Sequence, residues 1–271
     1  MGKAIFFDID GTLVNFRGRM PGSTRHAIKQ IQEKGHRIVI CTGRSLCQIY
    51  PWLIDMHFDG IIAAAGAYVE CDSRIIYEHH MDREAIAAVL SSFRRVNASY
   101  AAQTKDMVIV TPDNKKRLLD RFSSMGVSED MAVQFWKSVY VGEYPIHRQD
   151  IEKFTFFDAR TTVSNIQEEL SDYCDVTGLS FENPTDNSGE ISCKGINKSL
   201  GIRKYIEHTG IAREDTIAFG DGPNDMDMIE YARVGVAMGN AIDELKQRAD
   251  YMTAGVDEDG IEHALKMLGL L

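Results

Sequence analysis

The sequence predicts an α/β protein with a doubly wound, Rossmann-like parallel-sheet core that carries an inserted α+β domain. Sections at the two ends of the chain alternate short apolar runs with helix-like segments, which is typical of parallel strands joined by crossover helices. The middle of the chain lacks this alternation, and a length of 271 residues favours two domains over one compact core. We therefore predict a core formed by residues 1–80 and 188–271, with residues 81–187 inserted as a second domain.

The N-terminal section begins the predicted sheet. Residues 4–7 and 37–41 are largely apolar, which indicates buried strands. A helix is expected between them at residues 23–34, because Ala27, Ile28 and Ile31 would share one face and a glycine follows as a stop signal. Residues 61–65 are expected to form a third strand.

The other elements are predicted from the same two patterns. The C-terminal section is expected to hold strands at 216–219 and 234–237, and helices at 198–208, 225–232, 243–248 and 258–268. The inserted section is expected to hold helices at 83–95, 115–123 and 162–172, and strands at 107–110, 138–141 and 153–157. Polar, turn-rich residues at 78–82 and 183–189 are predicted as the hinges between the two domains.

Charge and composition disfavour several classes of function. The net charge of −10 would repel polyanions and anionic lipid surfaces, so we expect no nucleic-acid and no membrane partner. Asp8 and Asp10 interrupt the N-terminal apolar run too early for a secretory signal. The five cysteines are odd in number and form no CxxC pair, which argues against a disulfide framework. We expect a cytoplasmic protein with no obligate protein partner.

The strongest functional signal is the string Asp8-Ile9-Asp10-Gly11-Thr12, directly after the first strand. Ligands bind at the carboxyl ends of the strands in a doubly wound sheet. Residues two apart in an extended chain point the same way, so Asp8 and Asp10 can converge on one ligand. Gly11 permits a turn that brings main-chain N–H groups close to an anion. A strand closed by an ordinary Asp-Gly turn is the weaker alternative, because two carboxylates follow a wholly apolar strand.

A second candidate is Cys41-Thr42-Gly43-Arg44, which follows the second strand at the same edge of the sheet. The Thr42 hydroxyl and the Gly43 amide can hydrogen-bond a phosphate oxygen, and Arg44 could add positive charge. Taken alone this signal is weak, since such a turn can open a helix without any ligand.

A third cluster, Gly220-Asp221-Gly222-Pro223-Asn224-Asp225, follows another apolar strand. Carboxylate and amide oxygens on a tight turn suit Mg²⁺, which takes few protein ligands and keeps waters and substrate oxygens around it. The alternative is an Asx-rich turn that caps the next helix.

The four aspartates of these motifs would repel one another and any phosphorylated substrate if they met at one edge. Such a site needs cations. A divalent metal is one source, and a lysine from residues 194–198, either Lys194 or Lys198, is the other. A surface lysine is usually solvated. We place one in the site because the acidic cluster needs compensating positive charge.

The motifs and their order along the whole chain resemble the haloacid dehalogenase (HAD) superfamily, specifically the Cof-type (subfamily IIB) phosphatases with a C2 cap. This resemblance implies that residues 1–80 and 188–271 are the catalytic core and that residues 81–187 form a C2-type α+β cap that sets substrate specificity. The strings at 237–241 (AMGNA) and 258–260 (EDG) are also similar to this family.

The resemblance implies a role for each matched residue. Asp8 would be the nucleophile, Asp10 the general acid/base and Thr42 the residue that holds the transferring phosphoryl group, while the KGxxK pattern favours Lys198 over Lys194. The implied metal is Mg²⁺, with ligands Asp8, Asp10 through its main-chain carbonyl, and Asp221, and with Asp225 in support. The implied substrate and phosphate contacts are Gly11, Gly43, Arg44 and, at the rim of the site, Asn224.

Two positions depart from the family pattern. The family usually has an Asn-Gly-Ala turn after the third strand, where this chain has Ala65-Gly66-Ala67. It also has an asparagine four residues before Gly260, where this chain has Val256. Both positions are near the site in the family, so its substrate contacts there do not carry over to this chain.

The predicted activity is Mg²⁺-dependent hydrolysis of small phosphorylated metabolites, such as sugar phosphates, through an aspartyl-phosphate intermediate on Asp8. A phosphotransferase or phosphomutase would use the same nucleophile and exclude water, so release of phosphate without an acceptor separates the two. A noncatalytic phosphometabolite sensor is a weaker alternative, because a pure binder gains nothing from carboxylates placed around an anion.

Overall fold

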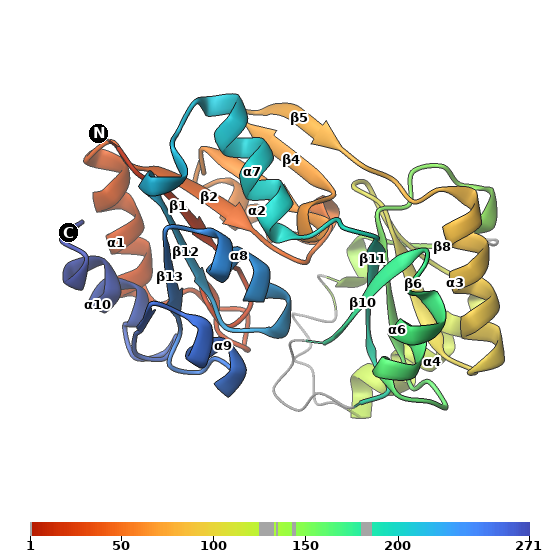
Figure 1. Cartoon of the computed structure of the whole chain (residues 1–271). Helices are drawn as coiled ribbons and strands as arrows, with labels where there is room; N and C mark the ends of the chain where they lie inside the picture. Colours follow the sequence, from red (N-terminus) through yellow and green to blue (C-terminus); the bar gives the residue numbers. More distant parts are fainter. Residues whose placement is uncertain (1, 125–132, 134, 143–144, 180–185) are drawn as a thin grey trace. The chain divides into compact units, whose positions relative to one another are not determined.

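A computed structural model describes residues 2–124, 133, 135–142, 145–179 and 186–271 of the chain. The chain forms two compact units (Figure 1). The first unit comprises Met1–Gly43, Asp55–Tyr77 and Asn197–Leu271, and the second comprises Arg44–Ile54 and Glu78–Ile196.

The boundaries of the two units differ from the predicted division. Residues 44–54, 78–80 and 188–196 belong to the second unit and not to the core. The first of these segments is tied to the second unit by hydrogen bonds, since the Ser45 hydroxyl donates to Gln103 Oε1 at 2.9 Å and the Cys47 N–H donates to the Lys105 carbonyl at 2.9 Å. The last one contains a strand of that unit's sheet. Residues 183–185 of the predicted second hinge lie outside the described residues.

The first unit is built on an eight-stranded sheet. Its strands are parallel from β14 to β3, and β4 is antiparallel to β3. The register sets Phe7 of β1 level with Phe219 of β12 and Ile40 of β2, so these three strands end at the same edge. The strand order is β14 (Tyr251–Met252), β13 (Val234–Ala237), β12 (Thr216–Gly220), β1 (Ala4–Phe7), β2 (Arg37–Cys41), β3 (Gly60–Ala63), β4 (Tyr68–Cys71) and β5 (Arg74–Glu78).

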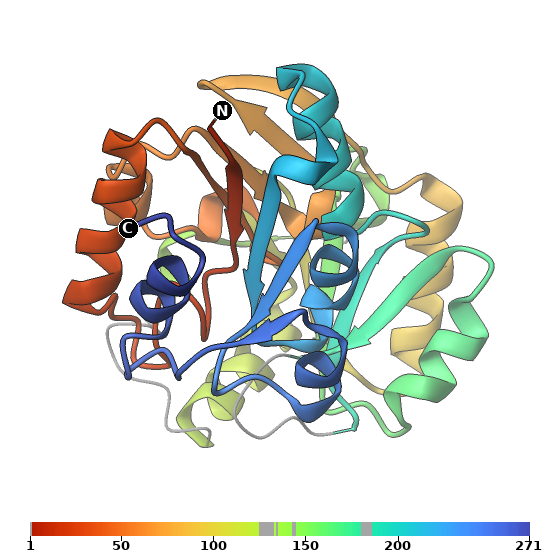
Figure 2. The same ribbon diagram turned by 60° about the vertical axis from the view of Figure 1, so that its left-hand side comes forward.

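Helices cover both faces of this sheet (Figure 2). On one face α1 (Gly22–Glu33) packs against α10 (Gly260–Met267), and on the other lie α7 (Lys198–Thr209), α8 (Met226–Tyr231) and α9 (Asp243–Arg248). Because strand residues alternate between faces, Phe6 and Val39 pack with Ile202 of α7 and Ile229 of α8 in one buried cluster. This is a doubly wound core whose strand ends meet at one edge.

The second unit has a six-stranded sheet in which β7 and β8 are parallel and the other described pairs are antiparallel. Phe93 of α3 packs against Phe154 and Phe156, which point from β9 toward the same side. The strand order is β10 (Cys174–Gly178), β11 (Gly189–Cys193), β9 (Lys153–Phe157), β6 (Ser99–Gln103), β7 (Val108–Val110) and β8 (Val139–Val141). Helices of this unit include α2 (Pro51–Ile54), α3 (Arg83–Arg95), α4 (Pro112–Ser124) and α6 (Val163–Leu170).

The fold class is confirmed, with local differences from the predicted elements. The third strand ends at Ala63 and not at residue 65, because Ala64 and Ala65 have left-handed backbones with φ of 48° and 54°. The helix expected from residue 225 begins at Met226, since Asp225 closes a 3₁₀ turn. All five cysteines are free thiols. Among the described residues, no helix combines the length and apolar character that a membrane span needs.

Candidate active site

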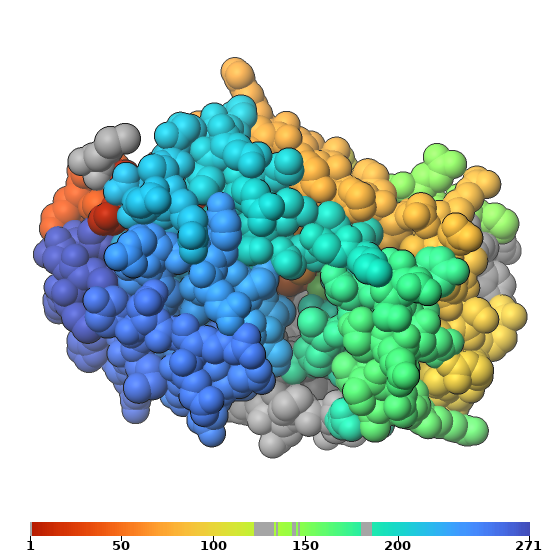
Figure 3. Space-filling model, viewed as in Figure 1, coloured from red at the N-terminus to blue at the C-terminus, as the bar shows by residue number. Residues whose placement is uncertain are grey.

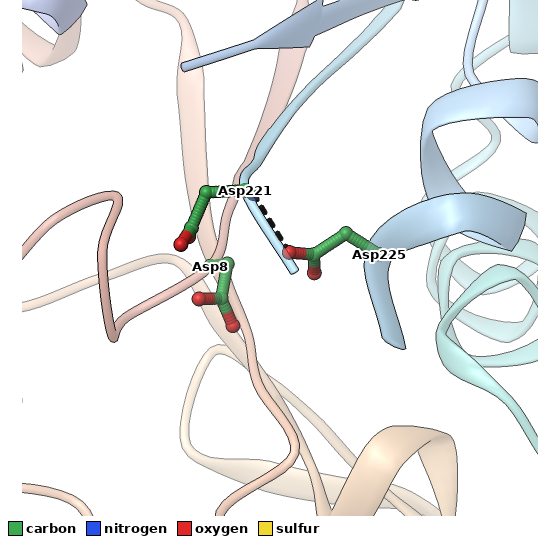
Figure 4. Close-up of side chains that lie close together, drawn as sticks. All are labelled: Asp8, Asp221 and Asp225. Carbon is green, nitrogen blue, oxygen red and sulfur yellow. Dashed lines mark hydrogen bonds between the residues drawn. The ribbon is translucent and has the colours of Figure 1, made fainter. Parts of the chain in front are cut away.

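Three aspartates meet at the carboxyl ends of the central strands (Figure 4). Asp8 follows β1, Asp221 follows β12, and Asp225 ends the 3₁₀ turn before α8. Each offers a carboxylate oxygen within 4.8 Å of the other two, and all three residues are at most 5% exposed. Residues more than 200 positions apart in the sequence therefore form one buried acidic cluster, as the sequence motifs predict.

Lys198 provides a buried positive charge for this cluster. Its ammonium group donates to Asp8 Oδ1 at 2.7 Å and to Asp225 Oδ1 at 2.5 Å, and the residue is fully buried. Lys198 is the first residue of α7, whose preceding residue Asn197 accepts the N–H of Leu200 at 2.9 Å. Lys194, the other candidate, is exposed and belongs to the second unit. The lysine that contacts the carboxylates is therefore Lys198.

Asp225 is a supporting residue in this arrangement. Its Oδ2 accepts the main-chain N–H groups of Asp221 and Gly222, both at 2.9 Å, while its Oδ1 accepts from Lys198. The dashed line in Figure 4 marks the bond to Asp221. These bonds shape the turn that presents Asp221 and anchor Lys198, so each oxygen of Asp225 already has a structural partner.

Asp221 is oriented by residues of the β1 loop and of the loop after β13. Thr12 donates its hydroxyl to Asp221 Oδ1 at 2.9 Å, and Asn240 donates to the Gly11 carbonyl at 2.9 Å and to Asp221 Oδ2 at 3.4 Å. Gly11 has a φ of +88°, and a Cβ at this position would lie 2.0 Å from Asp221 Oδ2. Sequence reasoning assigned Thr12 and Asn240 no role, although both stand inside motifs that it singled out.

Burial dominates the electrostatics of the cluster. It raises the pKa of Asp8 to about 7, with the charges of Asp225 and Asp10 adding to the effect and Lys198 opposing it. It also raises the pKa of Asp221 to about 9, helped by Asp8 and Asp225 and opposed mainly by the Thr12 hydrogen bond. Burial disfavours a charged Lys198, yet the carboxylates of Asp225 and Asp8 raise its pKa well above the usual value. Lys198 therefore carries a positive charge at neutral pH.

The donor set of this cluster fits a divalent metal ion. When Asp8, Asp221 and Asp225 are all ionised, Lys198 balances one of their three negative charges and leaves two. Burial first, and then the neighbouring carboxylates, raise the pKa of both Asp8 and Asp221, and a bound cation would offset this excess of negative charge. Hard carboxylate oxygens are the ligands that Mg²⁺ prefers. Asp8 and Asp221 are the natural ligands, because both oxygens of Asp225 have other partners.

The other predicted site residues of the first unit stand in the loops that follow β1, β2 and β12. Asp10 is half-buried, and Asn224 stands in the 3₁₀ turn Pro223–Asp225. Thr42 is buried one residue beyond β2, and its carbonyl accepts the Ala65 N–H at 3.0 Å. Gly43 is the last residue of the first unit before the chain enters the second.

Arg44 has hydrogen bonds within the second unit. Its guanidinium donates to the Gln48 carbonyl at 2.9 Å and to the Tyr50 hydroxyl at 3.1 Å, and lies 4.5 Å from the centre of the Tyr50 ring. Phosphate binding by Gly11, Gly43, Arg44 and Asn224, and metal binding by the Asp10 carbonyl, stay predictions.

The fold and the site together define a class of enzyme. Its members have buried carboxylates and a lysine at the carboxyl ends of the strands of a doubly wound sheet. The chain belongs to the haloacid dehalogenase-like hydrolases, whose family model matches residues 5–265. Phosphatases of this superfamily generally use a divalent metal, and the acidic cluster suits one.

Known relatives cover the whole chain. YkrA of Bacillus subtilis (strain 168) is 32% identical over 273 residues, which span 99% of this chain and 98% of YkrA. The 5-amino-6-(5-phospho-D-ribitylamino)uracil phosphatase YwtE of the same organism is 28% identical, covering 98% of each chain. The solved structure of the HAD subclass IIB sugar phosphatase BT4131 has a TM-score of 0.82 and 31% identity, covering 99% of this chain and 100% of that one. The chain is thus a subclass IIB member of the superfamily.

Proposed function

We propose that this HAD phosphatase hydrolyses small phosphorylated metabolites in a Mg²⁺-dependent reaction, through an aspartyl-phosphate intermediate on Asp8. The observation that carries this proposal is the buried contact of Asp8 with Lys198, beside the second carboxylate of Asp221. One oxygen of Asp8 is held by Lys198 at 2.7 Å, which leaves the other to act as the nucleophile. The names of the relatives, a sugar phosphatase and a phosphoribityl-uracil phosphatase among them, support phosphomonoesters of small polyols as substrates.

The residues of this chain divide the reaction between them. The free Asp8 oxygen forms a bond to phosphorus as the ester oxygen leaves, and Asp10 gives that alkoxide a proton. Asp10 then takes a proton from water, whose oxygen attacks phosphorus and breaks the bond to Asp8. Lys198 stays positively charged and offsets the charge of the phosphoryl oxygens. Mg²⁺ held by Asp8, Asp221 and the Asp10 carbonyl would supply further positive charge to the same oxygens.

We assign the choice of substrate to the second unit, which is the inserted α+β domain. The described residues of this unit contribute no carboxylate to the acidic cluster, whose three members come from the first unit. Variation in the inserted domain can therefore change the leaving group without changing the phosphoryl chemistry.

The test is a phosphate-release assay on sugar phosphates, pyridoxal phosphate, flavin mononucleotide and 5-amino-6-(5-phospho-D-ribitylamino)uracil, with Mg²⁺ or with a chelator. We expect turnover of at least one substrate without an added acceptor, loss of turnover with the chelator, and loss in Asp8→Asn. Mass spectrometry of the trapped enzyme should place phosphate on Asp8. Phosphate on another residue, or transfer only to a second metabolite, would contradict the proposal.

A further inference from the structure

Asp227 contacts the segment that carries Lys198. It lies in the first turn of α8, and its Oδ2 accepts the main-chain N–H of Ser199 at 2.7 Å. Ser199 is the second residue of α7 and follows Lys198 directly. Burial raises the pKa of Asp227, while the bond from Ser199 and the charge of Lys198 oppose this rise. The carboxyl is therefore placed by a specific contact, although no step of the proposed reaction uses it.

Two carboxylates from one short segment hold the same part of α7. Asp225 accepts a hydrogen bond from the side-chain ammonium of Lys198, and Asp227 accepts one from the peptide N–H that follows it. The surfaces of α7 and α8 adjoin in Figure 3, and the two helices pack together. Because a lysine side chain has four rotatable carbon–carbon bonds, the position of its tip depends on where the main chain is fixed.

Helix capping alone does not explain this contact. The start of α7 already has a cap within its own segment, since Asn197 accepts the N–H of Leu200. That bond stabilises the first turn but cannot fix α7 relative to another helix. The Asp227 bond joins α7 to α8, which directly follows the turn that holds Asp221 and Asp225.

We propose that Asp227 is a positioning residue for Lys198, fixing the start of α7 against α8 so that the ammonium group lies between Asp8 and Asp225. This inference rests on the proposed function, because it concerns the lysine that acts in phosphoryl transfer. Catalytic groups must be held closely in place, and small displacements reduce turnover strongly.

The test compares three variants of the full chain with Mg²⁺ and a substrate found active in the assay above. Asp227→Ala removes the acceptor, and we expect kcat to fall about tenfold with a smaller change in KM. Asp227→Asn keeps an amide oxygen in the same place, so it should retain most of the wild-type kcat. Asn197→Ala removes the internal cap of the same helix and leaves the tie between helices, so it should lower the unfolding temperature but keep kcat within about twofold.

Inhibition by orthovanadate separates positioning from general destabilisation. Vanadate resembles the phosphoryl group in transfer, so its affinity should fall in parallel with kcat in Asp227→Ala and stay near wild type in Asn197→Ala. If Asp227→Ala does not fold, Asp227→Glu keeps the charge and displaces the acceptor, and it should lose kcat and vanadate affinity together. Wild-type kcat in the folded variants, or equal losses in Asp227→Ala and Asn197→Ala, would overturn the inference.

Lys198→Ala distinguishes failure of this inference from failure of the proposed function. If Lys198→Ala is inactive while Asp227→Ala is fully active, Lys198 acts as proposed and only the role of Asp227 is refuted. If Lys198→Ala turns over like the wild type, the role given to Lys198 is wrong and the role of Asp227 falls with it. Failure of the proposed function would instead show as a wild-type enzyme that releases no phosphate or carries no phosphate on Asp8.

Discussion

At the scale of the residue, the three buried carboxylates of the site differ in the hydrogen-bond donors that compensate their negative charge. The two carboxylate oxygens of Asp225 accept hydrogen bonds from Lys198 and from two main-chain N–H groups, whereas Asp8 accepts one from Lys198 through a single oxygen. Among the described residues, the hydrogen-bond donors to the Asp221 carboxylate are the neutral groups of Thr12 and Asn240. The carboxyl with the weakest compensation, Asp221, is also the one whose pKa is raised furthest, to about 9.

Ala65 stores backbone strain beside this site. Its φ of 54° and ψ of 33° are left-handed, a region that costs an L-residue roughly 1–2 kcal/mol and glycine little. We therefore expect Ala65→Gly to stabilise the chain by up to about 1 kcal/mol in urea unfolding, after the greater flexibility of glycine in the unfolded chain is subtracted. Asparagine, the usual residue of the family at this position, also tolerates this conformation.

Ala67 provides the matched control. It lies two residues later with an ordinary right-handed backbone, φ −72° and ψ −21°. Ala67→Gly gains no relief of strain and loses a buried methyl group, so it should destabilise the chain by about 1 kcal/mol. Destabilisation by both substitutions would show that the turn at Ala65 carries no strain.

At the scale of the element, the sequence predicted strands in which most residues are apolar. Residues 4–7, 153–157 and 234–237 were placed with correct limits. The strands that were not predicted are β4, β5, β6, β10, β11 and β14. Three of them, β6, β10 and β11, have the sequences SYAAQ, CDVTG and GEISC, in which small and polar residues obscure the pattern. Their pairing is set by neighbours distant in the chain, such as Glu190 opposite Thr155, and no local pattern reports such contacts.

Glu152, which precedes β9, is predicted to make stability depend on pH. It is 1% exposed, and among the described residues neither carboxylate oxygen has a hydrogen-bond partner. Burial, then the charges of Glu78 and Asp106, raise its pKa from 4.5 to about 8 against the opposing Lys105 and Lys153. The folded chain therefore binds this proton more tightly than the unfolded chain, and stability falls as pH rises from about 4.5 to about 8.

The substitution Glu152→Gln tests this dependence. Glutamine keeps the shape of the side chain and cannot ionise. Between pH values of about 4.5 and about 8, the variant should therefore lose less stability than the wild type. Urea unfolding at several pH values measures this difference. Glu168→Gln, an exposed residue on α6 of the same unit, should leave the pH profile unchanged. Parallel profiles for wild type and Glu152→Gln would mean that Glu152 is charged in the folded chain.

At the scale of the whole molecule, the sequence located the acidic site better than the limits of the two units. Asp8 and Asp221 could be found because each directly follows an apolar strand, and strand ends in a doubly wound sheet share an edge. The role of segment 44–54 could not be found, because its place in the second unit rests on bonds from Ser45 and Cys47 to residues more than 50 positions away. The same limitation hid Asn240, whose partners lie in three separate loops.

Binding of Mg²⁺ is predicted to stabilise the folded chain and to release protons. Burial and neighbouring carboxylates raise the pKa of Asp8 from 3.8 to about 7 and of Asp221 from 3.8 to about 9, so the metal-free enzyme loses stability as pH rises from about 3.8 to about 9. A cation must displace these protons, so its affinity should increase with pH until about 9. Calorimetric titration in two buffers of different ionisation enthalpy measures the protons released, and the unfolding temperature should rise with Mg²⁺ concentration. Asp221→Asn should abolish both effects. Glu244→Gln, at an exposed position on α9, is the control and should keep them. A Mg²⁺ affinity that is independent of pH, or that is unchanged in Asp221→Asn, would place the metal elsewhere.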